Sequence, residues 1–393
     1  VGFLNAFELP REKWQQLIAE LSENQLSNFH LPFTVAPNFL VNGKMMAFPL
    51  VTEESSVVAA LAKAARFWAE RGGFHSTILG TEKQGHVHFT WNGDPEILKK
   101  RFPEIKKQLL LEAKPLTGKM EKRGGGINTL ELKYLPETAP DYYQIDASFE
   151  TCDAMGANFI NSCLEQFGKT LKTALSTPAP DSKKPSSPEI IMAILSYYVP
   201  GSLVKVWAEC PMSELDKIPG QGRLLAERFI LATDIARKDI SRAVTHNKGI
   251  FNGLDALAVA TGNDYRAMEA GGHAFAARDG QYKGLTKAFT QDDTFRIEME
   301  IPIAAGVVGG VTALHPLAKF SMQILQNPTA KDLMTFLAVA GLASNWSAVK
   351  ALVTGGIQQG HMKMHLNNIL NTLNVTGKTR EAAREYFNNH EVS

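Results

Sequence analysis

The stretch His86-Val-His-Phe-Thr-Trp91 decides how the middle of the chain folds. Val87, Phe89 and Trp91 alternate with polar residues, which predicts a strand with one buried face. Further elements are predicted in turn: a helix over 95–114 with an interruption at Pro103, strands over 130–134 and 145–149, a helix over 153–175 and a last strand over 202–210. The resulting order β-α-β-β-α-β is typical of a ferredoxin-like sandwich.

The segments on either side of this sandwich have a helical pattern instead. Helices are predicted over 10–22, 54–71, 223–244, 254–260 and 334–353, with one strand over 295–302. The sandwich, residues 79–211, is therefore predicted to be inserted in a larger, mostly helical domain formed by 1–78 and 212–357, which gives an α+β fold class. A stretch rich in Pro, Ser and Lys, 176–188, is predicted to be a surface excursion.

The composition is that of an ordinary soluble globular protein, with 44% hydrophobic and 21% charged residues. At 393 residues the chain exceeds the usual size of a single core, so two domains are expected. A formal net charge of +1 gives no electrostatic reason to expect nucleic acid or a membrane surface as a partner.

No segment is predicted to cross a membrane or to direct secretion. The longest nearly uncharged run, 301–314, is too short to span a bilayer. No cationic start followed by an apolar stretch indicates a signal peptide. Cys152, Cys163 and Cys210 lack the spacing of a disulfide framework or a metal site, so we expect a protein of the reducing cytoplasm.

The string Asp153-Ala-Met-Gly-Ala-Asn158 is a candidate phosphate-binding motif. An Asp at a helix start caps the exposed amides, and small residues in the first turn let a phosphate approach the positive end of the helix dipole. The string is equally typical of a well-capped helix that packs on a sheet, so spacing alone leaves both interpretations open. No Gly-x-Gly-x-x-Gly turn is present in the sandwich, so a dinucleotide site here must be of a non-Rossmann kind.

The run Arg123-Gly124-Gly125-Gly126 precedes the second predicted strand. Such a flexible loop beside a cation could fold as an amide-lined nest around a pyrophosphate. Taken alone it is also compatible with an ordinary glycine-rich turn.

Lys248 and Asp264 are candidates for stabilising charge on a substrate. Lys248 lies in Thr-His-Asn-Lys-Gly, just past a predicted long helix, and Asp264 follows sixteen residues later in Gly-Asn-Asp-Tyr. A lysine near a carbonyl oxygen can stabilise the negative charge that builds up when hydride adds to the carbon. A neighbouring aspartate would orient that lysine, although each residue alone is also compatible with a solvated surface charge.

Glu54 opens a predicted apolar helix. A half-buried acid at such a place is suited to donate a proton at neutral pH. An ordinary first-turn glutamate, favoured by the helix dipole, is the alternative interpretation.

His361 and His365 are four residues apart and would share one face of a helix. The string His-Met-Lys-Met-His lacks the glutamate of the zinc-protease motif, so a zinc site is the less favoured interpretation. A histidine after a glycine near a C-terminal segment better suits proton delivery to a leaving thiolate.

Taken together, five strings resemble those of one family, the HMG-CoA reductases of class II, the bacterial, soluble type. They are Glu53-Glu-Ser-Ser-Val-Val-Ala-Ala60, Asp153-Ala-Met-Gly-Ala-Asn158, Thr245-His-Asn-Lys-Gly249, Ala260-Thr-Gly-Asn-Asp264 and Gly356-Ile-Gln-Gln-Gly-His-Met362. They occur in the family's order, and the similarity extends from about Phe33 to His365.

The resemblance implies reduction of (S)-HMG-CoA to mevalonate and CoA by two nicotinamide hydrides, a step of isoprenoid biosynthesis. It assigns catalytic roles as follows: Lys248 to the carbonyl oxygen, Glu54 to proton donation, Asp264 to the organisation of both, and His361 to protonation of the CoA thiolate. It assigns the HMG carboxylate and hydroxyl to Ser56, Arg242 and Asn252.

The resemblance also implies where the cofactor binds. The dinucleotide would be held by Gly124, Gly125, Gly126, Thr129, Asp153, Met155, Gly156 and Asn158, in a small non-Rossmann cofactor domain. Residues 358–393 would form a helical C-terminal flap, and the protein would be a homodimer with its active site at the subunit interface. No metal is implied.

Thr129 bears on the choice of cofactor. Members of the family that prefer NADH can carry an aspartate three residues past the triple glycine, where this chain has Thr129. An aspartate would bind the ribose 2′-hydroxyl and repel a 2′-phosphate. Its absence, with Lys122 and Arg123 nearby, favours NADPH or the use of both cofactors.

Three alternatives remain at this point. The same enzyme could run oxidatively to catabolise mevalonate, because a catalyst accelerates both directions. A catalytically silent CoA- or nucleotide-binding homologue would be expected to have lost one of the four catalytic residues, all of which are present. A zinc hydrolase built on His361 and His365 would reveal itself by stoichiometric metal.

Overall fold

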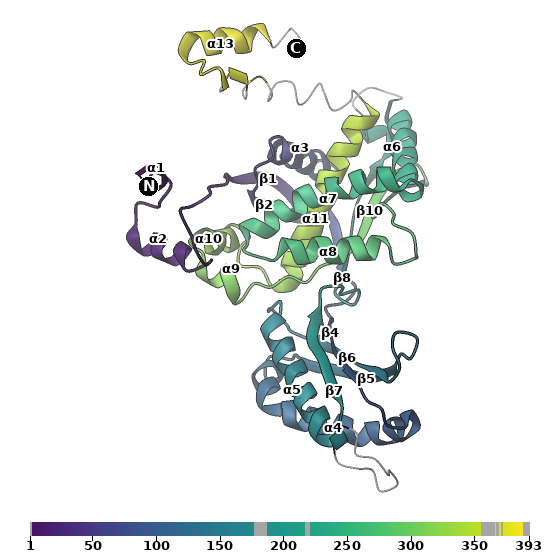
Figure 1. The fold of residues 1–393 in the computed structure, drawn as a ribbon. Coiled ribbons are helices and arrows are strands. Elements are labelled where there is room, and N and C mark those ends of the chain that lie inside the picture. The colour runs from purple at the N-terminus through teal and green to yellow at the C-terminus, as the bar shows by residue number, and fades with distance from the viewer. Residues whose placement is uncertain are drawn as a thin grey trace.

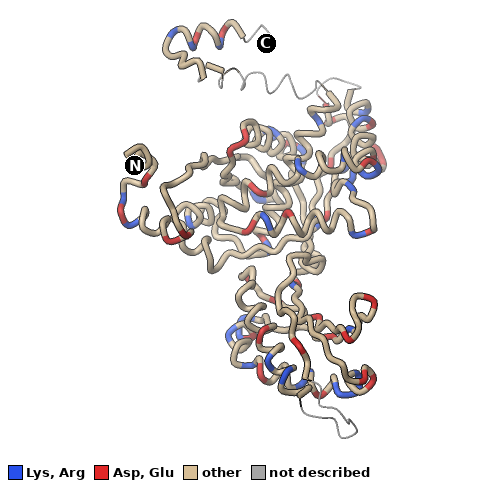
Figure 2. The backbone as a smooth tube through the Cα atoms, in the orientation of Figure 1, with Lys and Arg blue, Asp and Glu red and all other residues tan. Residues whose placement is uncertain are grey.

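The computed structural model describes residues 2–176, 187–216, 221–354, 366, 369–370 and 372–387. The described chain forms two bodies with separate hydrophobic cores, a large one and a smaller one that lies below it in Figure 1. Lysines and arginines are interspersed with aspartates and glutamates over both bodies (Figure 2), as expected for a net charge of +1.

The small body has the predicted ferredoxin-like order. Its elements are β4 (Lys83–Thr90), α4 (Pro95–Glu121), β5 (Gly126–Tyr134), β6 (Tyr142–Glu150), α5 (Ala157–Ser176) and β7 (Glu189–Ser196). The strands form one antiparallel sheet in the order β5-β6-β4-β7. Apolar residues of α4 and α5 pack on one face of this sheet and close the small core. The prediction of this topology from alternation is therefore confirmed.

Two details of that prediction were wrong. The last strand of the sandwich is β7, whereas the predicted run 202–210 is β8 (Leu203–Pro211), which pairs with strands of the large body. Strand β7 was missed because its residues are mostly apolar and exposed rather than alternating in burial. Helix α4 also continues through Pro103 and Pro115 to Glu121, longer than predicted.

The large body contains more sheet than the sequence pattern indicated. Its main sheet has the order β3-β8-β10-β9, with β3 at His75–Ile78, β9 at Thr286–Gln291 and β10 at Thr294–Pro302. A separate hairpin is formed by β1 (Phe33–Val41) and β2 (Lys44–Val51). Its helices are α3 (Val57–Ala69), α6 (Gln221–Lys238), α7 (Ile240–Ala260), α8 (Tyr265–Ala276), α9 (Gly310–Leu314), α10 (Pro316–Ile324) and α11 (Ala330–Val353), with the short η1 (Met212–Glu214).

Helix α11 runs through the middle of the large body (Figure 1). It is long and apolar enough to cross a membrane, but 67% of its most apolar window is buried among the other elements, as in the core helix of a soluble fold. Trp346 on α11 packs against Trp68 of α3 with ring centroids 5.0 Å apart and the ring planes tilted by 60°. The all-round apolar surface of α11 is therefore explained by burial on every side.

Two predicted helices of the large body needed correction. The predicted helix 223–244 is two helices, because Asp239 breaks it and accepts a hydrogen bond of 2.9 Å from the backbone N–H of Arg242 as the N-cap of α7. The helix predicted from Glu54 begins at Val57, because Ser56 adopts a left-handed conformation with φ +78°.

Helices α1 (Gly2–Asn5), α2 (Glu12–Ala19) and α13 (Gly377–Tyr386) contribute no buried residues to either core. In Figure 1 they lie to the side of the large body and above it. The predicted helix over 10–22 is confirmed as the shorter α2.

Candidate active site

Helix α7 presents two of the predicted site residues on one face. Lys248 and Asn252 are one turn apart, whereas Arg242 lies in the first turn of the helix. Lys248 was expected just past a helix but lies inside α7. A Cβ at Gly253 would come within 2.4 Å of the backbone oxygen of Ala340, so α7 and α11 approach backbone to backbone. This close contact fixes where α7 presents its polar face.

The structure brings Glu54 and Lys248 together. The Lys248 Nζ lies 2.6 Å from Glu54 Oε2, although 194 positions separate the two residues in sequence. Their side chains are 59% and 39% exposed, so the pair is open to a ligand while Glu54 is half-buried. The Glu54 N–H donates to Thr52 Oγ1 at 3.1 Å in the turn before α3. The carboxylate is thus held by a lysine rather than by the first turn of a helix.

Asp264 lies at the start of α8. It is the N-cap of α8, where its Oδ1 accepts from the Ala267 N–H at 3.2 Å and lies 3.5 Å from the Arg266 Nε. Among the contacts of the described residues, it does not reach Lys248. The carboxylate caps the helix because an N-cap satisfies backbone amides that would otherwise lack partners.

Buried amides behind Lys248 were missed by the sequence analysis. Asn247, fully buried, donates to Tyr282 Oη at 3.0 Å and to the Lys283 carbonyl at 2.9 Å, and it accepts from the Leu285 N–H at 3.0 Å. Asn345 of α11 donates to the His246 carbonyl at 3.0 Å and accepts from Thr286 Oγ1 at 3.0 Å. These bonds fix the rotation of α7 at Lys248. An asparagine inside the apolar α11 was the available signal.

His246 belongs to this buried support and not to the ligand-facing side. It is 2% exposed, and burial together with the nearby Arg242 lowers its pKa to about 3. It is therefore neutral at physiological pH. A neutral imidazole next to Lys248 in sequence adds no like charge to the Glu54–Lys248 pair.

Asp255 and Glu269 form a second carboxyl pair that the sequence did not indicate. Burial, the nearby Glu269 charge and a hydrogen bond between the two side chains raise the pKa of Asp255 to about 8. Asp255 lies on α7, three residues past Asn252, and Glu269 lies on α8. The pair therefore holds a proton at neutral pH and joins the two helices that carry Lys248 and Asp264.

The triple glycine forms a tight loop at the start of β5. Gly124 and Gly126 have φ of +90° and +131°, conformations that favour glycine. A Cβ at Gly125 would lie 2.5 Å from the carbonyl oxygen of Glu150, so the loop packs directly on the end of β6. The exposed Arg123 precedes it. The Gly124 and Gly125 N–H groups donate to the Glu121 and Met120 carbonyls at 2.9 and 3.1 Å, so the loop ends α4, and the exposed Arg123 is the group beside it that could attract a pyrophosphate.

The Asp153–Gly156 part of the candidate motif is a turn, and α5 begins only at Ala157. Gly156 has φ +94° in this turn. The Asp153 carboxylate accepts from the Ala330 N–H at 2.9 Å, at the first turn of α11, and its carbonyl accepts from the Val307 N–H at 2.9 Å. The predicted capping of α5 by Asp153 was wrong, and the residue instead joins the small body to the large one.

The remaining predicted residues fall into two groups. Met155 lies in the same turn, against Gly306 of the large body, where a Cβ would come within 2.5 Å of the Met155 nitrogen. Asn158 is exposed in the first turn of α5, and Thr129 is exposed on β5. Two predicted features lie outside the described residues. These are the histidines His361 and His365, and most of the predicted excursion 176–188. In the described part of the chain, no group of three or more His, Cys, Asp and Glu side chains could hold a metal ion.

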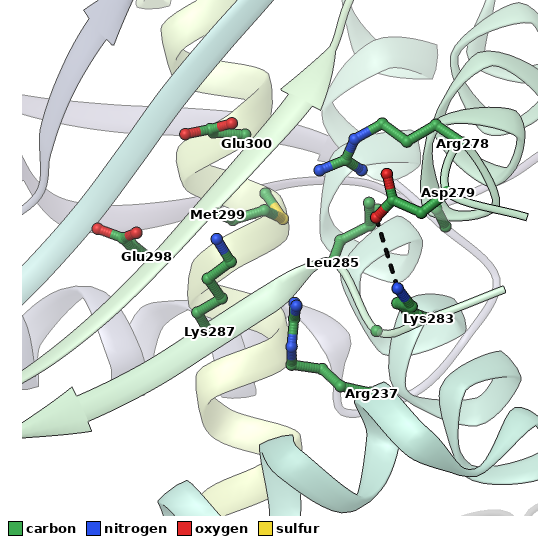
Figure 3. A pocket seen from close by; sticks show the side chains of 11 residues that line it. Arg237, Arg278, Asp279, Lys283, Leu285, Lys287, Glu298, Met299 and Glu300 are labelled. Atoms are coloured by element: carbon green, nitrogen blue, oxygen red, sulfur yellow. Dashed lines mark hydrogen bonds and ion pairs between the residues drawn. The ribbon is translucent and has the colours of Figure 1, made fainter. Parts of the chain in front are cut away.

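A separate open pocket of about 450 Å³ lies where α6 and α8 end against β9 and β10 (Figure 3). Its charged lining is Arg237, Arg278, Asp279, Lys283, Lys287, Glu298 and Glu300. Lys283 forms an ion pair with Asp279 at 3.5 Å. The Lys283 carbonyl and the Leu285 N–H are also the backbone groups that bind Asn247. The pocket therefore borders the support of α7, and none of the predicted site residues lines it.

Comparison with known proteins decides the family. The sequence profile described as Hydroxymethylglutaryl-coenzyme A reductase matches residues 4–366. The chain belongs to this family. It is 35% identical over 363 residues to the 3-hydroxy-3-methylglutaryl-coenzyme A reductase of Archaeoglobus fulgidus, which covers 90% of this chain and 78% of the relative.

Solved structures of HMG-CoA reductase from Streptococcus pneumoniae share the fold. One matches with a TM-score of 0.79 and 36% identity, over 89% of this chain and 94% of that one. Another, a class II enzyme bound to NADPH in open conformations, matches with a TM-score of 0.78 and 36% identity, over 89% and 95% of the two chains. As a member of the HMG-CoA reductase family, the chain is an oxidoreductase that acts on HMG-CoA.

Proposed function

We propose that this HMG-CoA reductase works in the biosynthetic direction and reduces (S)-HMG-CoA to mevalonate and CoA with two NAD(P)H. The observation that carries the proposal is the 2.6 Å contact between Lys248 and Glu54. Reduction of a thioester puts negative charge on a carbonyl oxygen, which needs a cation and then a proton. The pair supplies both groups at one partly exposed point.

Lys248 would bind the carbonyl oxygen and stabilise its charge during both reductions. Glu54, in contact with that ammonium group, would deliver the proton through it or directly. Because the two side chains already touch, no large rearrangement is needed to couple charge stabilisation to protonation. Asp264, at the start of α8, would join this network when the substrate binds. It would then give up the hydrogen bond that it accepts from the Ala267 N–H.

Substrate groups would bind along the same surface. Asn252 lies one turn beyond Lys248, and Arg242 lies in the first turn of α7. These two residues and Ser56 would hold the HMG carboxylate and hydroxyl. Ser56 follows Glu54 in the turn before α3, so the left-handed backbone there places both residues at one end of the helix.

The small body, which ends with β7 rather than at residue 211, would hold the cofactor between the Gly124–Gly126 loop and the Asp153–Asn158 segment. The fit rests on the two positive-φ glycines, the packing of Gly125 on β6, and Arg123. When bound, NAD(P)H supplies the hydride. The NADPH named for the S. pneumoniae structure supports NADPH as a cofactor here, with NADH as the other candidate.

His361, outside the described residues, would protonate the departing CoA thiolate from the flap 358–393. We also propose a cytoplasmic homodimer with the active site at the subunit interface and with no nucleic acid or membrane partner. Exposed apolar side chains on α6 and the start of α7 support an interface: Leu224, Leu231, Ile235, Ile240 and Val244.

The test follows nicotinamide absorbance with (S)-HMG-CoA and either cofactor, together with thiol release. The expected result is oxidation of two cofactors per CoA released. Saturation at much lower concentrations of mevalonate and oxidised cofactor than of HMG-CoA and reduced cofactor would favour the catabolic direction, because the enzyme accelerates both directions. Binding of CoA without turnover by the folded protein would favour the silent homologue.

A further inference from the structure

A line of hydrogen bonds connects Thr129 to a carboxylate on another strand segment. The Thr129 Oγ1 lies 2.6 Å from Ser148 Oγ, and Ser148 Oγ lies 2.7 Å from Glu82 Oε1. Thr129 is exposed, whereas Ser148 is 5% exposed. Glu82 just precedes β4, so three neighbouring strand segments each contribute one residue to this Thr129–Ser148–Glu82 relay.

The direction of these hydrogen bonds follows from the number of hydrogens available. A carboxylate only accepts, so the single hydroxyl hydrogen of Ser148 is donated to Glu82. The remaining bond then requires the Thr129 hydroxyl to donate to Ser148. Thr129 is left with lone pairs only, and it can accept a hydrogen bond from a ligand but cannot donate one to it.

Glu82 is held in this position from three sides. Its N–H donates to the Gly201 carbonyl at 3.1 Å, and its Oε1 also accepts from Asn128 Nδ2 at 3.0 Å. A Cβ at Gly201 would come within 3.2 Å of the Glu82 Cβ, so the backbone at Gly201 packs closely against Glu82. The next residue, Lys83, is buried, and the charge of Glu150 partly offsets the lowering of its pKa by burial. Because successive side chains of a strand point to opposite faces, Lys83 lies on the face opposite to Glu82.

We propose that Glu82, acting through Ser148 and Thr129, is a positioning residue for cofactor specificity that keeps NADH usable beside NADPH. The inference rests on the proposed function, and it takes the ribose 2′ position to lie near Thr129, as the family resemblance implies. A 2′-hydroxyl can donate to the acceptor-only Thr129. A 2′-phosphate meets lone pairs there and the negative charge of Glu82 behind them. Lys122 and Arg123, exposed at the neighbouring loop, act in the opposite sense and attract the phosphate.

Glu82→Gln tests the proposal, because glutamine keeps the shape but loses the charge. The glutamine amide can donate to Ser148. Ser148 can then donate to Thr129, and the Thr129 hydroxyl can donate to the ligand. The ratio of kcat/KM for NADPH to that for NADH is expected to rise about tenfold, since a like charge near the phosphate is removed. Thr129→Val is expected to lower kcat/KM with NADH and to leave NADPH nearly unchanged.

Glu137→Gln is the matched control, since Glu137 is an exposed glutamate in the turn after β5. It makes the same charge change within the small body, and its cofactor ratio should equal that of the unaltered chain. A Glu82→Gln ratio within twofold of this control would overturn the proposal. If Glu82 had only a structural role, Glu82→Gln would lower kcat/KM equally for both cofactors and would leave the ratio unchanged.

Binding measured by nicotinamide fluorescence separates this inference from the proposed function. If HMG-CoA-dependent turnover is absent, the ratio of the two dissociation constants in Glu82→Gln and in the control still tests Glu82. A shift of that ratio towards NADPH supports the relay even then. Equal ratios, or no binding of either cofactor, overturn it.

Discussion

Helix α7 and the Thr129–Ser148–Glu82 relay hold their polar groups in contrasting ways. The bonds that fix α7 involve Asn247 and Asn345, which are 0% and 1% exposed. The relay ends at Thr129 and is joined by Asn128, both exposed. A buried amide that loses its partners costs far more than an exposed one. The proposed chemistry therefore stands on a rigid support, whereas the proposed specificity lies where residues can change without unfolding the chain.

The strongest test of the α7 side is Lys248→Ala. We expect kcat to fall by about 10²–10³-fold or more with both cofactors, because the cation that stabilises the oxyanion is removed. Steady-state kinetics with NADPH and NADH would measure this. Lys172→Ala, at an exposed lysine of α5, is the matched control and should retain activity. Activity within tenfold of the unaltered chain would refute the role assigned to Lys248.

The contrast itself is tested by the same substitution on each side, Asn345→Ala and Asn128→Ala. Asn345→Ala removes the buried amide that donates to the His246 carbonyl and accepts from the Thr286 hydroxyl, so each of these two groups loses a hydrogen bond. Its free energy of unfolding should fall by about 3 kcal/mol. Asn128→Ala removes an exposed bond to Glu82 and should cost less than about 0.5 kcal/mol. Urea unfolding with a common slope measures both, and equal losses would remove the distinction between the two regions.

The same contrast explains what the sequence could and could not predict. Alternation in Val87, Phe89 and Trp91 was enough for the small sheet, because a half-buried strand shows its period directly. Strand β7 has no such alternation, and the end of the sandwich was therefore misplaced. The break at Asp239 is one capping residue inside a helical pattern, which periodicity does not detect.

The candidate site divides along similar lines. Motif resemblance paired Glu54 with Lys248, and the structure joins them. It could not show that Asp153 accepts from the Ala330 N–H of α11 or that Asp264 caps α8, because the same carboxylate serves a ligand or a helix end equally well. The Asp255–Glu269 pair and the Glu82 contacts depend on residues brought together from different elements, so no local pattern carries them.

The Asp255–Glu269 pair predicts how α7 responds to pH. The pKa of Asp255 is raised to about 8 in the fold from 3.8, so the folded state binds the proton more tightly than the unfolded chain. The stabilisation from this proton is complete below pH 3.8 and is lost as pH rises towards about 8. Asp255→Asn mimics the protonated form at every pH.

The difference in Tm between Asp255→Asn and the unaltered chain should therefore increase from pH 5 to about pH 8 and then level off. Calorimetry across this range measures it, and groups that titrate in both proteins cancel in the difference. Asp279→Asn, at an exposed carboxylate paired with Lys283, is the control and should show a flat difference. A flat difference for Asp255→Asn as well would mean that the pair holds no proton in the fold.

A loss smaller than that for Asn345→Ala is expected at the junction between the small and the large body. Asp153→Ala removes the carboxylate that accepts from the Ala330 N–H at the start of α11. We expect the free energy of unfolding to fall by about 1 kcal/mol, as for loss of a helix cap. Asp153→Asn keeps an acceptor and should lose less, because only the interaction of the charge with the helix dipole is removed.

Urea unfolding of both variants would rank them, and steady-state kinetics would show whether the junction matters beyond stability. If Asp153 mainly aligns the turn beneath the cofactor, Asp153→Ala should raise KM for NAD(P)H and leave KM for HMG-CoA unchanged. An equal rise in both KM values would mean that the two bodies shift together. The support of α7 would then extend across the junction, and the separation between a rigid chemical side and an adjustable specificity side would not hold.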